Sequence, residues 1–144
     1  MARMHALFAF LLLPLLAGAG GPANMPPLIQ PLEGTQWWVE DIGGRGVVDA
    51  SHTTIAFVNE GGVSGDTGCN RYHGTYVQEG KAVSFGPMAG TRRACPEALM
   101  NQEQRFYAAM GQVVSWRIDA ADRLLLVGPG QEILIRAFAT DENP

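Results

Sequence analysis

The residues best suited to chemistry lie in two short runs, and each run holds one of the two cysteines of the chain. Residues 65–76 read GDTGCNRYHGTY and contain Cys69, whereas residues 91–97 read TRRACPE and contain Cys95. A pair of thiols can form a disulfide, bind a metal ion together with imidazole groups, or supply a nucleophile. Each use makes different demands on the residues around the cysteines.

A zinc site would combine Cys69, Cys95 and His73, because thiolates and imidazoles are natural zinc ligands. The fourth ligand would be His52 or a water molecule. The chain contains no C-x-x-C pair, which is a common spacing in structural zinc sites. The sequence therefore gives little support to a metal site, and we expect no cofactor.

A catalytic cysteine would need a base such as His73 beside Cys69, and Asn70 or Glu103 to orient that base. These residue types are present, but no spacing in the sequence brings them together in this order. Three carboxylates near the cysteines could instead act as general acid and base, although acidic residues more often have solvated or capping roles: Asp66, Glu97 and Glu103. We therefore expect no enzymatic activity.

The first 19 residues have the pattern of a secretory signal peptide. Arg3 forms the basic start, residues 6–16 are apolar, and residues 17–19 form a small-residue cleavage site. The apolar run is shorter than the roughly 20 residues of a membrane-spanning helix. We expect a periplasmic or secreted protein without stable membrane insertion, and without a lipid anchor, because no cysteine lies directly after the cleavage site. In that oxidising compartment Cys69 and Cys95 are expected to form a disulfide.

Length and composition indicate one globular domain. The chain has 144 residues, of which 47% are hydrophobic and 17% are charged. Its net charge of −4 and the lack of a basic face argue against nucleic-acid binding. Residues 20–32 are rich in proline and are predicted to be a linker, so the folded domain is expected over residues 33–140.

Short apolar and β-branched runs between turn residues predict an antiparallel sheet. The expected strands cover residues 33–42, 53–58, 63–67, 74–78, 82–85, 113–118, 124–127 and 133–138. A helix is expected from Pro96 to about Gly111, because Pro96 suits the first helical position. Leu99, Phe106 and Met110 recur on one face of that helix. This pattern is typical of an α+β fold.

Several residues of the first cysteine run are expected to shape the backbone. Glycine and asparagine tolerate positive φ angles, and an asparagine side chain can hold a turn by binding backbone groups nearby. This structural motif comprises Gly65, Gly68, Asn70, Arg71, Tyr72 and Gly74.

Large aromatic rings are numerous for so small a sheet: Trp37, Trp38, Tyr72, Tyr76, Tyr107 and Trp116. They either fill the space between helix and sheet or line an open groove for an apolar ligand or peptide. Side chains alternate along a strand, so one of the paired tryptophans is expected in the core and the other at the surface. A possible binding surface comprises Trp37, Trp38, Tyr72, Arg92 and Arg93, although loop arginines are usually solvated.

The two cysteine runs and their flanking elements resemble the META domain family, which is also called HslJ-like. The resemblance rests on V-S-G-x-x-G-C-N-R-Y-x-G-x-Y at residues 63–76 and on M-A-x-T-x-x-A-C-P at residues 88–96. A W-x-V strand at residues 37–39, a T-x-x-F strand at 54–57 and an L-x-L strand at 124–126 follow the order of that family.

This resemblance implies a strongly bent antiparallel sheet, similar to a half-barrel, with one main helix packed against its concave side. It also implies a bacterial envelope protein associated with heat shock and antibiotic tolerance, without an established enzymatic activity or cofactor. We therefore expect an exported, non-catalytic domain that binds an envelope protein. The alternative is a carrier or inhibitor that holds a small apolar ligand or a peptide in the groove of the sheet.

Overall fold

The computed structural model describes residues 31–140, so the predicted signal peptide and all but the last two residues of the predicted linker lie outside the described part. The elements in chain order are β1 Gln36–Ile42, β2 Arg45–Gly46, β3 Thr54–Val58, η1 Asn59–Gly61, β4 Gly62–Asp66, β5 Arg71–Glu79, β6 Ala82–Phe85, β7 Ala89–Gly90, α1 Glu97–Met110, β8 Ser115–Ile118, β9 Arg123–Val127 and β10 Ile133–Ala139. No helix within residues 31–140 is long and apolar enough to cross a membrane.

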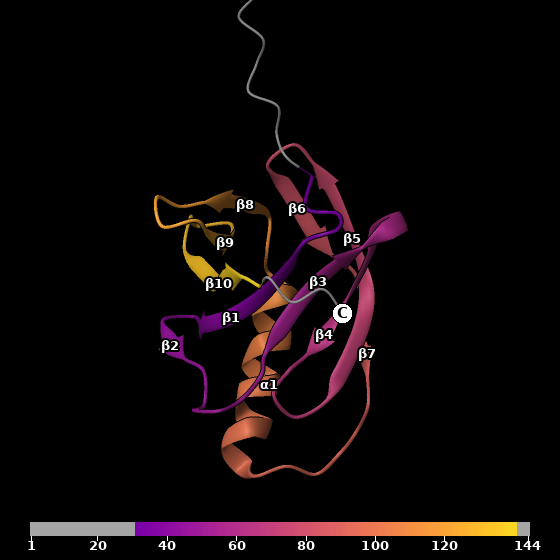
Figure 1. Cartoon of the computed structure of the whole chain (residues 1–144), viewed down its shortest axis with the longest axis vertical. Coiled ribbons are helices and arrows are strands. Elements are labelled where there is room, and N and C mark those ends of the chain that lie inside the picture. The colour runs from indigo at the N-terminus through magenta and orange to yellow at the C-terminus, as the bar shows by residue number, and fades with distance from the viewer. Residues whose placement is uncertain (1–30, 141–144) are drawn as a thin grey trace, which may run out of the picture.

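The predicted α+β fold, with one strongly bent antiparallel sheet and one main helix, is confirmed (Figure 1). Neighbouring strands follow the order β10-β9-β8-β6-β5-β4-β3-β1, and β10 also pairs with β1. The sheet therefore curves further than the half-barrel we expected, because its strand order returns to its starting point. Closure leaves fewer strand edges that could pair with other chains.

The joint between β6 and β8 is the thinnest in this ring. A single register pair, Ala82 opposite Ser115, joins the two strands. Two backbone hydrogen bonds flank this pair, from Val83 N to the carbonyl of Val114 at 3.2 Å and from Trp116 N to the carbonyl of Lys81 at 2.9 Å.

The core lies inside the curved sheet and follows the alternation of the strands. Ile55 and Phe57 of β3 point inward and are fully buried, as predicted. Trp37 is also buried, whereas its neighbour Trp38 is half-buried on the outer face, so the predicted division of the pair is confirmed. Leu32 was predicted to be linker, but it is buried in the core, and the core therefore begins one residue before the predicted start of the domain.

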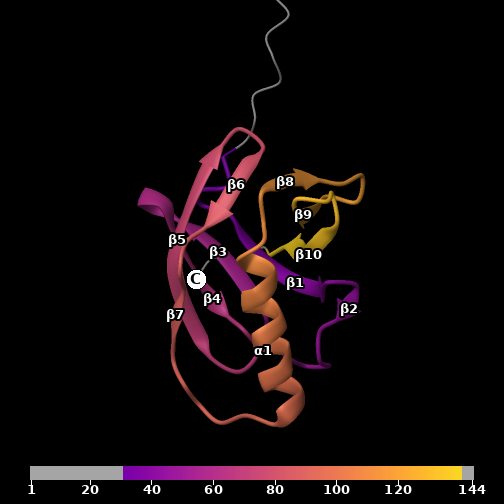
Figure 2. The same ribbon diagram turned by 180° about the vertical axis from the view of Figure 1, so that it is seen from behind.

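Helix α1 lies against the concave side of the sheet and is best seen from behind (Figure 2). It begins at Glu97, one residue later than predicted, because Pro96 has the extended backbone of an N-cap. The predicted inward residues Phe106 and Met110 are buried, whereas Leu99 in the first turn of α1 is only half-buried.

The longest strand differs most from its prediction. We expected β5 to begin at Gly74, but it begins at Arg71. Residues 71–74 pair with β4 on one side, and Tyr72 and His73 pair with the short strand β7 on the other. Residues 86–91 were expected to run irregularly towards Cys95, so β7 at Ala89–Gly90 was not predicted.

Phe106 is the expected main anchor of the helix, because it is fully buried and its ring lies 5.2 Å from that of Tyr72. Replacing it with alanine should lower the free energy of unfolding by about 3–5 kcal/mol, since a large buried ring leaves a cavity. Chemical denaturation measures this loss. Met100→Ala on the same helix is the control, because Met100 is 40% exposed and should change stability little. Equal losses from both changes would contradict the helix orientation.

Candidate functional site

The two cysteines form a disulfide that joins the corner between β4 and β5 to the start of α1. Cys69 and Cys95 have Cα atoms 5.9 Å apart, and the bond links positions 26 residues apart in sequence. Cys69 is buried, and Cys95 is half-buried. A disulfide sulfur is neither a thiolate nucleophile nor a zinc ligand, so both alternatives for Cys69 are contradicted in this oxidised state.

The histidines of those alternatives lie elsewhere. His73 is exposed on β5, and His52 lies against Trp38 in a tilted arrangement with ring centroids 4.8 Å apart. Within residues 31–140, no group of three or more metal-binding side chains is positioned to hold an ion.

The corner before β5 is built by short-range hydrogen bonds. Gly68 has a φ of +91°, which favours glycine, and its N–H donates to Asp66 Oδ1 at 2.7 Å. The hydroxyl of Thr67 accepts the N–H groups of Cys69 at 3.3 Å and of Asn70 at 3.0 Å. The same hydroxyl donates to Glu103 Oε2 on α1 at 2.6 Å, which ties the corner to the helix.

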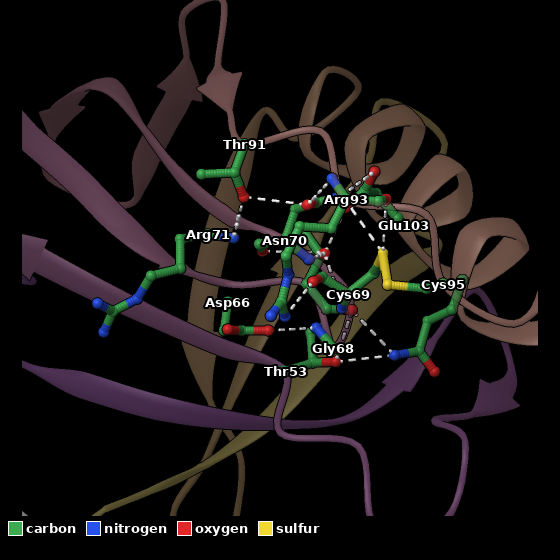
Figure 3. The surroundings of a disulfide bond; sticks show 12 residues. Thr53, Asp66, Gly68, Cys69, Asn70, Arg71, Thr91, Arg93, Cys95 and Glu103 are labelled. Atoms are coloured by element: carbon green, nitrogen blue, oxygen red, sulfur yellow. Dashed lines mark hydrogen bonds between the residues drawn. A yellow bond between two sulfur atoms is a disulfide. The ribbon is translucent and has the colours of Figure 1, made fainter.

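Asn70 is the centre of this junction (Figure 3). Its Nδ2 donates to both carboxylate oxygens of Glu103, at 3.2 and 3.1 Å, and to the sulfur of Cys69 at 3.3 Å. Its Oδ1 accepts the N–H of Arg93 at 2.6 Å and the hydroxyl of Thr91 at 3.0 Å. We predicted that Asn70 holds a local turn at positive φ, but it instead binds two segments that are distant in sequence, and its φ is not positive.

A second buried amide, Gln102, lies next to this junction and was not predicted. Its Nε2 donates to Thr53 Oγ1 at 2.9 Å and to the carbonyl of Thr67 at 3.1 Å, and its Oε1 accepts the N–H of Val48 at 2.7 Å. Gln102 is four residues before Phe106 on α1, so helical periodicity could have placed it on the buried face. Hydrogen bonds of this kind compensate a buried amide for its lost water.

The three candidate carboxylates do not form an acid–base pair. Glu103 is held by Thr67 and Asn70, and Asp66 accepts the N–H of Gly68. Glu97 is exposed in the first turn of α1, where a negative charge suits the helix dipole.

The arginines of the two cysteine runs lie in different surroundings. Arg93 Nη2 donates to the carbonyl of Cys69 at 2.9 Å and so belongs to the junction. Arg71 extends away from the junction in Figure 3, and Arg92 is exposed. The arginines therefore do not act together as one surface.

Tyr72 was proposed as part of a binding surface, but it is only 3% exposed. Its hydroxyl crosses β4 above Gly65, its register partner, and donates to the carbonyl of Thr54 at 2.9 Å. Burial raises the pKa of Tyr72 well above its ordinary value, and the nearby Tyr107 and Asp66 raise it further. Trp37 is also buried, at 7% exposed, so neither ring can contact a partner.

Two glycines of the motif are required for a different reason than predicted. Gly65 and Gly74 do not have positive φ angles. A Cβ atom on Gly65 would collide with the carbonyl oxygen of Thr54, and one on Gly74 would lie 3.0 Å from Met88 Cγ. These glycines therefore allow close approach of neighbouring segments.

Most of the aromatic rings fill the core, which decides between the two uses considered for them. Tyr76 and Trp116 are buried with Trp37 and Tyr72, whereas Tyr107 is half-buried. The ring of Tyr107 borders an apolar pocket of about 380 Å³ between the end of α1 and the segment after β6. This pocket is lined by Phe85, Gly86, Pro87, Met88, Tyr107, Met110 and Gly111.

The disulfide should contribute to stability as one unit. Cys69→Ala and Cys95→Ala should each destabilise the oxidised protein by a similar amount, about 3.5 kcal/mol in the loop-closure description, and the double variant should cost little more. Denaturant unfolding of the three variants measures this. Additive losses would show that the cysteines act separately.

The buried tyrosines should make folding sensitive to alkaline pH. Burial is the leading cause of a raised pKa at Tyr72, Tyr76 and Tyr107. The folded state therefore holds these protons above pH of about 10, where the unfolded chain releases them. The contribution of these tyrosines to the free energy of unfolding should be fully present below pH of about 10 and should decrease as the pH rises further. Tyr72 should ionise last. Tyrosinate absorbance and unfolding free energy measure this, and Tyr72→Phe should reduce the slope. Ordinary titration of all three in folded protein would contradict it.

The comparisons with known proteins agree on the fold. A family model for the META domain matches residues 30–140. No curated protein matches the chain. An NMR structure of a protein from Burkholderia xenovorans is 24% identical, with a TM-score of 0.63, and the match covers 77% of this chain and 85% of that one.

Two other solved structures are similar. An NMR structure of another protein is 20% identical over 73% of this chain and 89% of its own, with a TM-score of 0.57. A crystal structure of a duf4847 family protein from Bacteroides vulgatus ATCC 8482 is 16% identical over 76% of this chain and 95% of its own, with a TM-score of 0.57. These likenesses show a shared fold, and the family model spans most of the chain, which therefore belongs to the META domain family.

Proposed function

We propose that the protein is an exported, non-catalytic domain of the bacterial envelope that acts by binding another protein during stress, such as heat or antibiotic exposure. The non-catalytic part of this proposal is supported by the contacts of the candidate catalytic residues, which are made with other residues of the same domain. Cys69 is in a disulfide, and Asn70 and Glu103 bind each other. The groups that chemistry would require are therefore engaged in holding three segments together.

Export is supported by the disulfide and by the sequence of the first 19 residues. A structural disulfide is typical of proteins that function outside the reducing cytosol. The stress-related part of the proposal rests on what the resemblance to the META domain family implies, and the family model over residues 30–140 supports that resemblance.

The protein isolated from the envelope of its own organism should begin at Gly20 and gain two hydrogen atoms on reduction. Intact mass spectrometry measures both. Cross-linking in intact cells, before and after heat stress, should join the protein to a distinct envelope protein. Retention of residues 1–19, or a protein that cross-links to nothing under stress, would contradict the proposal. Saturable turnover that Cys69→Ser abolishes in folded protein would replace it with an enzyme.

A carrier of apolar ligands is the second candidate, and the apolar pocket beside Tyr107 supports it. Its walls of Phe85, Pro87, Met88 and Met110 suit an acyl or aromatic group. Native mass spectrometry of the isolated protein distinguishes the two, because a carrier would retain a small molecule whereas a protein-binding domain would appear as a bare polypeptide.

A further inference from the structure

An aromatic row crosses the outer face of the sheet. In the register of β1, Trp38 lies opposite Thr54 of β3 on one side and Phe138 of β10 on the other. Phe138 in turn lies opposite Arg123 of β9. Residues directly opposite each other in a sheet point to the same face, so these four side chains share the outer surface.

The two rings of this row and the adjacent ring of His52 form a continuous aromatic platform, which we define as Trp38, His52 and Phe138. The ring centroid of Trp38 lies 6.3 Å from that of Phe138 and 4.8 Å from that of His52. Phe138 is 44% exposed and His52 is exposed, whereas Trp38 is half-buried between them. Rings at such surfaces are enriched in protein-binding sites, because they bury a large area at small entropic cost.

A polar pocket of about 270 Å³ continues from the platform, because His52 belongs to both. Its charged walls are Asp49, Asp66 and Arg93, and Leu99 contributes an apolar wall. The pocket lies beside the disulfide junction, where Asp66 and Arg93 are drawn in Figure 3.

The charged walls of the polar pocket carry a net negative charge, because the two carboxylates of Asp49 and Asp66 outnumber the single guanidinium of Arg93. Within residues 31–140, neither Asp49 nor Asp66 has an ion-pair partner. The guanidinium of Arg93 is engaged by the carbonyl of Cys69. At the far end of the row, Arg123 pairs with Glu40 at 3.1 Å and with Asp119 at 2.8 Å.

We propose that the platform and the polar pocket together bind an extended segment of a partner protein in which an arginine or lysine lies a few residues from a large apolar residue. The apolar residue packs on Phe138 and Trp38. The basic side chain crosses His52, lays its alkyl stem along Leu99 and brings its charge to Asp49 and Asp66. The ring separations across the platform, 6.3 Å from Phe138 to Trp38 and 4.8 Å from Trp38 to His52, correspond to about three extended residues at about 3.3–3.6 Å each. This inference rests on the proposed function, because it names the surface and the chemistry of its partner.

The test titrates the full-length chain with a short synthetic peptide that carries one phenylalanine and one arginine about three residues apart in a Gly/Ser background. The matched peptide replaces arginine by norleucine, which keeps the stem and removes the charge. NMR chemical shifts locate the contact, and dissociation constants compare the peptides at low and high salt.

We expect shifts at Trp38, His52 and Phe138, and affinity about tenfold weaker for the norleucine peptide. Trp38→Leu should weaken binding about tenfold or more, and Asp49→Asn about threefold to tenfold. Asp49 suits the test because it is exposed, whereas Asp66 also caps the corner. The control is Val77→Ser, which removes an apolar group that is 63% exposed on β5 and should leave affinity within about twofold. Melting midpoints establish that each variant is folded.

Equal affinity for the two peptides, or shifts confined to other residues, would overturn the inference. So would unchanged binding by folded Trp38→Leu. The proposed function has a separate test, because cross-linking in cells does not depend on the peptide. A chain that cross-links to an envelope protein but ignores the peptide places the partner on another surface. A chain that binds the peptide as expected but cross-links to nothing keeps the surface and removes the stress-related role.

Discussion

The amide of Asn70 is the interaction on which the arrangement of this domain depends. Its oxygen accepts from the backbone of Arg93 and from Thr91, and its nitrogen donates to Glu103 and to the sulfur of Cys69. Both hydrogens and both lone pairs are therefore used, and the orientation of the amide is fixed because a backbone N–H can only donate. An aspartate here would face the carboxylate of Glu103, and a glutamine would extend too far. The disulfide adds a covalent link across the same junction.

Around this junction the sheet provides rigidity and the helix completes the core. Gly65 allows Tyr72 to cross to β3, and Gly90 gives similar room to Tyr107, whose hydroxyl would lie 2.8 Å from a Cβ at that position. Each tyrosine thus occupies space that a glycine leaves open. Gly65, Asn70 and Tyr72 of the motif therefore have structural roles.

Local patterns in the sequence were sufficient for the parts that have a local cause. The alternation of Trp37 and Trp38 and the burial of Phe106 follow from the periods of strand and helix. The buried group around Gln102 was missed because a glutamine alone is ordinarily read as surface, and its partners Thr53 and Thr67 come from other segments. Gly65 and Gly74 were expected to be needed for positive φ angles. The structure needs them because neighbouring segments approach their backbone closely, which the local sequence does not show. The platform could not be predicted, because Phe138 meets Trp38 only through strand pairing.

The pairing of β10 with β1 has a consequence for how the chain reaches this fold. Trp37 lies opposite Ala139, so strands at opposite ends of the described chain must meet before the sheet can close. Contacts between residues so far apart in sequence raise the contact order, and folding slows as contact order rises. The helix and the hairpins can form from neighbouring residues at any time, but closure of the ring must wait for its last strand. Residues that stabilise this final seam should therefore govern the lifetime of the folded protein more than the speed at which it forms.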